Sequence, residues 1–278
     1  MTSLVAARRP QHGEPASTLA AVRAQLVVVA ALLAAAGAAW WATAERMAGM
    51  DAGPGTDLGT PGWFVGAWSV MMAAMLLPSL APTAAVYAAL ARRRGPLGAV
   101  WFAGGYLLVW SAAGVVAYAT FVLGRHAFGS EFEWRAGGRW LAAGVLAAAA
   151  LYELTPLKGA CLMRCRRPLR FLRGRWREGG AGAFAMGARN GTWCVGCSWA
   201  LMAALFALGV MSLTWMALVG VLVAFEKVAP WRGPAVLVTM ALLLTLAAAI
   251  VLAPQEVPGL VVPGGAMGAA HAMHGMGG

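Results

Sequence analysis

The chain has 278 residues, of which 61% are hydrophobic and only 11% are charged, and its mean hydropathy is +0.71. A soluble domain carries about 25% charged residues, so this composition excludes a water-exposed globular protein. The net charge of +11 would suggest a nucleic-acid partner in a soluble protein, but the basic residues here cluster between apolar runs, as they do in cytoplasmic loops of membrane proteins. We therefore expect the lipid bilayer, and no nucleic acid, as a partner.

Seven segments are long and apolar enough to cross a bilayer, which takes about 20 helical residues. In chain order they cover residues 24–43, 63–90, 97–123, 140–157, 192–211, 212–229 and 234–252. Pro78 and Pro82 interrupt the second segment, and Pro156 breaks the end of the fourth. The fifth and sixth should form a tight antiparallel pair, and the basic, glycine-rich segment 158–190 is expected to be a loop. The predicted fold class is all-α, a polytopic transmembrane helix bundle of about seven spans.

The distribution of Lys and Arg predicts the orientation of these spans. With the N-terminus inside, the cytoplasmic side holds all but four of the 21 basic residues, a bias that sets topology strongly. The four on the outer side are Arg46, Arg125, Arg135 and Arg139. The C-terminus is then outside, and we expect the first span to be retained rather than cleaved. The expected regions are a cytoplasmic segment 1–23, a transmembrane domain 24–252 and an extracytoplasmic Met/His-containing tail 253–278.

Four cysteines form two closely spaced pairs, Cys161-x3-Cys165 after the broken end of the fourth span and Cys194-x2-Cys197 in the first turns of the fifth. Residues three or four apart share one face of a helix, so each pair can offer two sulfurs to one ion. Both pairs lie on the predicted cytoplasmic side, where thiols stay reduced and structural disulfides are not expected. Four converging thiolates suit a soft metal such as Cu(I), or zinc. The alternative is that they are small apolar residues at helix contacts.

Methionines are the second group of candidate ligands. Met71, Met72 and Met75 lie together on the second span, and Met202 lies on the fifth. Thioethers favour Cu(I) and remain neutral in lipid, although methionine is also a common filler of irregular cores. The C-terminal tail adds His271 and His274, each followed two residues later by a methionine. Short His-rich tracts of this kind indicate metal binding on composition alone, and a disordered tail is the alternative.

Charged residues within predicted spans are rare and therefore informative. Glu153 lies about one turn before Pro156, and Glu226 and Lys227 lie near the inner end of the sixth span. Lys227 is expected to extend to the interface. The two glutamates need a partner, for which a nearby arginine, a proton or a metal ion are the alternatives. No nucleophile elbow, P-loop, dinucleotide fingerprint or zinc-protease motif is present, so the sequence predicts no enzyme.

Five stretches carry a resemblance to a known family. They read WSVMMAAMLLPSLAPTAAVYAALARRR (68–94), GYLLVW (105–110), YELTPLKGACLMRCRRP (152–168), GTWCVGCSWALMAALFALGVMSLTWM (191–216) and FEKVAP (225–230). Together they resemble a bacterial family of predicted metal-binding integral membrane proteins, catalogued as a domain of unknown function. The resemblance implies metal binding, with some members linked to copper supply for copper enzymes. The matching positions are Met71, Met72, Met75, Pro78, Cys161, Cys165, Cys194, Cys197, Met202, Met211, Met216, Glu226 and Lys227. The family usually has a further cysteine where this chain has Ser198.

These observations predict a copper chaperone or conduit in the bacterial inner (plasma) membrane. Outer Met and His residues would capture Cu(I), intramembrane methionines would pass it on, and the cysteines would hold it for a copper-dependent enzyme or a metallochaperone. Zinc is the alternative ion. A membrane thiol oxidoreductase that uses the C-x2-C pair is the alternative function, and a structural assembly subunit with no ligand is the third.

Overall fold

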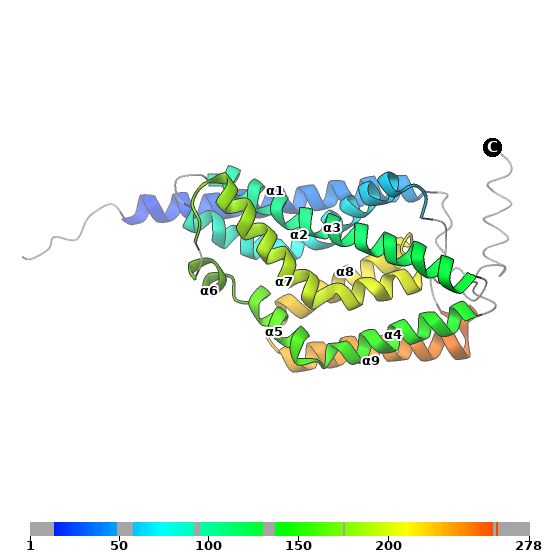
Figure 1. The fold of residues 1–278 in the computed structure, drawn as a ribbon. Coiled ribbons are helices and arrows are strands. Elements are labelled where there is room, and N and C mark those ends of the chain that lie inside the picture. The colour runs from blue at the N-terminus through cyan, green and yellow to red at the C-terminus, as the bar shows by residue number, and fades with distance from the viewer. Residues whose placement is uncertain are drawn as a thin grey trace, which may run out of the picture.

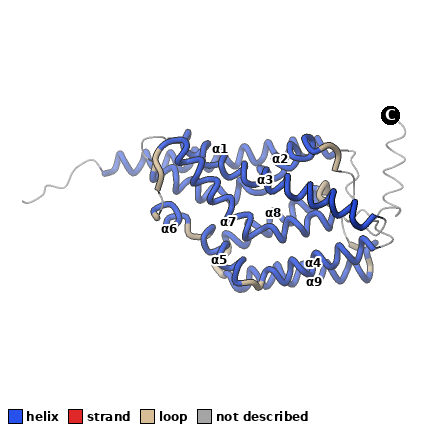
Figure 2. Tube along the Cα trace, in the orientation of Figure 1, coloured by secondary structure: helices blue, strands red, loops and turns tan. Residues whose placement is uncertain are grey.

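The protein is a bundle of long helices, seen in a computed structural model that describes residues 14–48, 58–91, 95–129, 137–174, 176–257 and 260 (Figures 1 and 2). The helices are α1 (Glu14–Met47), α2 (Pro61–Leu90), α3 (Gly95–Phe128), α4 (Arg139–Glu153), α5 (Pro156–Cys165), α6 (Pro168–Arg173), α7 (Gly179–Leu208), α8 (Leu213–Val228) and α9 (Arg232–Leu252), followed by a short 3-10 helix, Pro254–Glu256. No strand occurs in these ranges. The all-α fold class is confirmed.

Five of these helices, α1, α2, α3, α7 and α9, are long and apolar enough to cross a membrane. A sixth candidate is the pair α4 and α5, which are bent by 68° relative to each other across a short break. The expected sixth span corresponds to α8, whose 16 residues are fewer than the roughly 20 that a full bilayer crossing needs. Each of the seven expected segments is thus helical, and the protein is a membrane protein.

The second span is one continuous helix, although two prolines were expected to interrupt it. α2 includes both Pro78 and Pro82. Its start follows from the sequence, because Thr60 caps the helix through a hydrogen bond from the Trp63 amide at 3.4 Å and Pro61 suits the first helical position. Lipid offers no other partner for backbone groups, so a membrane helix continues through proline where neighbouring helices and hydroxyl side chains compensate. The Ser79 hydroxyl, between the two prolines, is itself satisfied within the helix, because it donates to the Leu76 carbonyl at 2.9 Å.

The segment expected as a basic loop, 158–190, is largely helical, and this expectation was wrong. It contains α5, α6 and the first part of α7, which begins at Gly179 rather than near residue 192. The glycines there serve close packing: a Cβ at Gly187 would collide with the Phe102 carbonyl of α3, and a Cβ at Gly105 with the Phe184 carbonyl of α7. Small residues let two membrane helices approach to backbone contact, so α7 is extended along α3.

The helices pack mainly in pairs, α1 with α2, α3 with α7, and α4 with α9. Figure 1 shows α4 and α9 side by side on the edge of the bundle away from α1, with α8 between that pair and the rest. The core contains large aromatic side chains as well as aliphatic ones. Trp68 is buried and donates its indole N–H to the Trp110 carbonyl at 2.8 Å, which ties α2 to α3. This arrangement leaves the C-terminal ends of α4 and α8 beside the middle of α7, where α5 joins them.

Candidate metal centre

The break between α4 and α5 places the first cysteine pair against α7. Thr155 lies in an extended conformation after α4, accepts a hydrogen bond from the Lys158 amide at 3.3 Å and donates to the Tyr152 carbonyl at 2.7 Å. Pro156 then starts α5 with its fixed φ. Because the chain turns by 68° there, α5 folds back and packs against α7. Two helices that the sequence separates by a long segment therefore meet.

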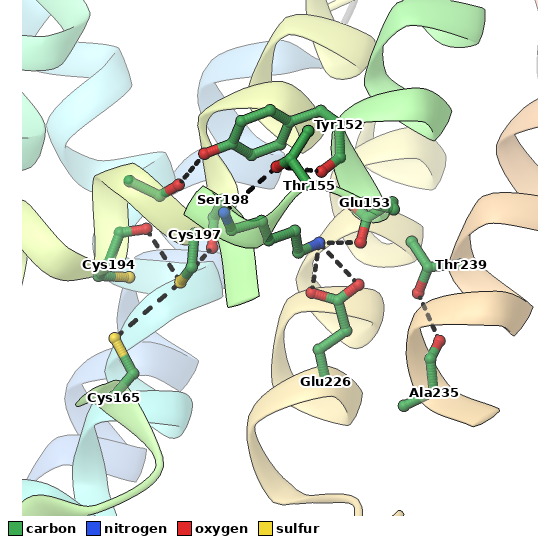
Figure 3. A network of polar contacts seen from close by, with 12 residues as sticks. Tyr152, Glu153, Thr155, Cys165, Cys194, Cys197, Ser198, Glu226, Ala235 and Thr239 are labelled. Atoms are coloured by element: carbon green, nitrogen blue, oxygen red, sulfur yellow. Dashed lines mark hydrogen bonds and ion pairs between the residues drawn. The ribbon is translucent and has the colours of Figure 1, made fainter. Parts of the chain in front are cut away.

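The thiols of Cys165 and Cys197 face each other across this contact, with their sulfurs 4.0 Å apart (Figure 3). Cys161 is buried in the same small cluster as Cys197. Its sulfur lies over Gly196, where an added Cβ would be 2.8 Å away, so the glycine of the C-x2-C pair makes room for it. Two sulfurs about 2.3 Å from one ion and about 120° apart around it would be about 4.0 Å from each other. The separation of Cys165 and Cys197 matches that value.

Cys194 has a different environment from the other three thiols. Its sulfur accepts a hydrogen bond from the Lys227 ammonium at 3.0 Å and is 2.9 Å from the Tyr106 hydroxyl. Lys227 also donates to the Ser79 hydroxyl at 3.0 Å. The expectation that Lys227 extends to the interface was wrong, because thiol and hydroxyl acceptors inside the bundle satisfy its ammonium. Three helices, α3, α7 and α8, thus meet at the Cys194 sulfur, and α2 joins them through the bond between Ser79 and Lys227.

Two further hydrogen bonds orient Cys197. Its thiol donates to the Cys194 carbonyl at 3.2 Å and lies 3.4 Å from the Ser198 hydroxyl. Ser198 is itself buried. Ser198, the position directly after the C-x2-C pair, therefore borders the Cys165 and Cys197 sulfurs, and its hydroxyl interacts with Cys197.

The glutamates of the membrane helices share a lysine. Lys158 of α5 donates to Glu153 of α4 and, at 2.9 Å, to Oε1 of Glu226 on α8, whose Oε2 is 2.8 Å away. All three side chains are at most 2% exposed, and Figure 3 shows both carboxylates pointing at one ammonium. The expected arginine partner was wrong. Lys158 was expected in a cytoplasmic loop. Its position five residues after the intramembrane Glu153 is the sequence signal that could have identified it as the partner of that glutamate.

The candidate methionines are buried in the main core. Met71, Met72, Met75 and Met202 are each no more than 4% exposed, and Met75 packs against α8 at Gly220, where an added Cβ would be 3.3 Å from its Cγ. Burial fits both a ligand and a core filler, so the ligand role stays a prediction. The sequence also suggested His271 and His274, which lie outside the described residues.

Within the residues that the structure describes, no three His, Cys, Asp or Glu side chains come together as a metal-binding group. Two of the candidate ligands do face each other, because the sulfurs of Cys165 and Cys197 are 4.0 Å apart. Both oxygens of Glu226, a further predicted ligand, face Lys158. Chemically, this arrangement offers two soft sulfur donors, one buried (Cys197) and one half-buried (Cys165), with the Lys227 ammonium at the neighbouring Cys194.

Comparison with known proteins gives one family. A family model described as PpoB2, copper chaperone, matches residues 65–251. This range includes most of α2, all of α3 to α8 and nearly all of α9, and with them all four cysteines. No curated protein and no solved structure matches the chain.

Proposed function

The chain belongs to the PpoB2 copper chaperone family, and from that premise we propose that it binds Cu(I) between Cys165 and Cys197 and supplies it to a copper enzyme. The observation that carries the proposal is the 4.0 Å separation of these two sulfurs across α5 and α7. Neither helix alone could supply both ligands. A bound ion would therefore link the two helices.

The donor set favours Cu(I) over zinc. Thiolate sulfur is a soft ligand and prefers Cu(I), which is satisfied by two or three such donors. Structural zinc sites are instead closed by four ligands, and the described residues do not gather even three His, Cys, Asp or Glu side chains at one point. A site with few ligands also suits a chaperone, because a thiol or thioether of the receiving site can bind the ion before one of the original ligands is released.

Cys161 and Cys194 are proposed as the neighbouring ligands through which the ion enters or leaves the pair. Cys161 shares a buried cluster with Cys197, and Cys194 lies one turn before Cys197 on α7. Stepwise exchange between adjacent sulfurs keeps the ion bound at every stage. The intramembrane glutamates have a separate role in this proposal: Glu226 forms an ion pair with Lys158 and fixes α5 rather than binding the ion.

The methionines and the tail are proposed to bring copper from the outer side. Met71, Met72, Met75 and Met202 line the interior of the same bundle, and His271 and His274 would capture the ion first. Thioethers are neutral donors that bind Cu(I) more weakly than thiolates do. Each methionine can therefore release the ion to the next one.

We further propose the bacterial inner membrane as the location, with the N-terminus and the cysteine pairs toward the cytoplasm and the C-terminus outside. The bias of Lys and Arg supports this orientation. An alkaline phosphatase fusion after Gly278 should then be active, and an inactive fusion would reverse the assigned sides. The receiving partner is proposed to be a copper-dependent enzyme or a soluble metallochaperone.

The test uses the purified full chain in detergent, loaded with Cu(I) under reducing conditions against a chromogenic chelator. Wild type is expected to bind one Cu(I), and the double variant Cys165→Ser/Cys197→Ser to lose that ion. Met240→Leu, which changes a thioether on α9, is the matched control and should bind as wild type does. Unchanged copper binding in the double variant would contradict the site.

The same samples distinguish the thiol oxidoreductase. That function requires the C-x2-C thiols to cycle to a disulfide, whereas a chaperone keeps all four thiols reduced before and after copper transfer. Alkylation followed by mass spectrometry counts the free thiols at each stage.

A further inference from the structure

A lysine ammonium lies beside the cysteines without a carboxylate partner. Lys227 donates to Cys194 and to Ser79, each at 3.0 Å. In the described part of the chain, both ion pairs belong instead to Lys158. Lys158 already offsets its charge against Glu153 and Glu226. Of the two lysines, Lys227 therefore has the uncompensated ammonium, and it contacts the sulfur of Cys194, one turn before Cys197 on α7.

The charge of the proposed site depends on the ion. Two thiolates with one Cu(I) carry a net charge of −1, which the ammonium of Lys227 neutralises. The same two thiolates with one divalent ion are neutral, so the ammonium is left as an uncompensated charge. Burying an isolated charge is costly in a medium of low dielectric constant. The same two sulfurs therefore bind a monovalent ion with a smaller electrostatic free-energy penalty than a divalent ion.

We infer that Lys227 is a specificity-determining residue that makes the thiol site select monovalent soft cations, Cu(I) and Ag(I), over divalent ones such as Zn(II) and Cd(II). This inference rests on the proposed copper site. The lysine contributes in two ways: it stabilises the thiolates that any metal needs, and it repels each positive charge that the metal brings. A divalent ion experiences that repulsion twice.

The size of the effect follows from Coulomb's law. As a scale, two unit charges about 8 Å apart at an effective dielectric constant of about 20 interact strongly enough to change a relative affinity by about 30-fold. Cys194 decides the direction of the effect. The inference applies to the state in which Cys165 and Cys197 alone hold the ion and Cys194 is outside the coordination shell. With Cys194 as a third thiolate, a divalent ion would give the neutral assembly, and the preference would reverse.

The experiment compares Ag(I) and Cd(II) binding to the purified full chain by competition with a thiol chelator. Wild type is expected to bind Ag(I) through Cys165 and Cys197 and to bind Cd(II) much more weakly. In Lys227→Gln, which keeps a donor for Ser79 and Cys194 but lacks the charge, the ratio of Ag(I) to Cd(II) affinity should fall by about 30-fold. Lys227→Arg keeps the charge and should keep the high ratio.

Three results would overturn the inference. They are a ratio unchanged in Lys227→Gln, a ratio that rises there, and a wild type that binds Cd(II) as tightly as Ag(I). The last result needs no variant, so poor folding of Lys227→Gln does not remove the test. If wild type binds Cu(I) at Cys165 and Cys197 while the ratio is insensitive to Lys227, only the selectivity is wrong. If wild type binds neither Cu(I) nor Ag(I), the proposed function itself fails.

Discussion

Replacing Lys158 with methionine removes the single cation shared by Glu153 and Glu226. All three side chains are at most 2% exposed, so the variant leaves two carboxylates buried with no counter-ion. Removing one partner of a buried ion pair costs about 3–5 kcal/mol. We expect Lys158→Met to lower the free energy of unfolding by that amount at pH 7.

The pH dependence of this loss gives an independent estimate. Carboxylates buried without a cation become protonated rather than remain charged. Protonating one glutamate, whose unperturbed pKa is about 4.3, costs about 3.7 kcal/mol at pH 7 and about 1 kcal/mol at pH 5. Because the folded variant binds more protons than its unfolded chain, its stability falls as pH rises. The difference from wild type should therefore be larger at pH 7 than at pH 5.

The assay is reversible unfolding in mixed SDS and detergent micelles, followed by circular dichroism. Glu153→Gln is the matched control, because Lys158 keeps Glu226 as its partner and the loss should be smaller. A triple variant that combines Lys158→Met with glutamine at both glutamates should regain most of the stability, since no buried charge remains in the group. A value for Lys158→Met within about 0.5 kcal/mol of wild type at both pH values would refute the shared-cation account.

Two further predictions concern packing and the copper route. Gly187→Ala forces a methyl group against a carbonyl of α3 and should destabilise the bundle by about 1–3 kcal/mol. Gly144→Ala, at a glycine of α4 with open space around it, is the control and should be neutral or slightly stabilising. Equal effects of the two variants in the same unfolding assay would argue against the α3–α7 contact. A triple variant with leucine at Met71, Met72 and Met75 preserves side-chain volume. It should leave the protein level normal while cellular copper accumulation falls. Unchanged copper accumulation would assign these residues to packing alone.

The spans and the approach of the two cysteine pairs were predictable because their physical causes are local in sequence. The bilayer imposes a minimum length of apolar helix, which marks each span. The spacing of Cys161 and Cys165, and of Cys194 and Cys197, places each pair on one helix face. The proline that breaks the fourth span indicated that the first pair could turn toward the second. The contact between the Cys165 and Cys197 sulfurs followed from those three facts.

Other features depend on packing between distant segments, and the sequence pattern was misleading there. The glycine-rich start of α7 has the composition of a loop, but α3 uses those glycines for close approach. Lys158 and Lys227 have the charge expected of cytoplasmic loops and interfaces, yet each points inward because acceptors from other helices surround its ammonium. For Lys158 the glutamate five residues earlier was a usable sequence signal, whereas for Lys227 only the three-dimensional arrangement shows that the side chain is not at the interface.

The most direct test of the central claim is X-ray absorption at the copper edge on the Cu(I)-loaded full chain. The account predicts a first shell of two or three sulfurs at about 2.3 Å, which is lost in Cys165→Ser/Cys197→Ser and kept in Met240→Leu. A first shell of nitrogen or oxygen atoms in wild type, or a sulfur shell that persists in the double cysteine variant, would contradict copper binding between α5 and α7.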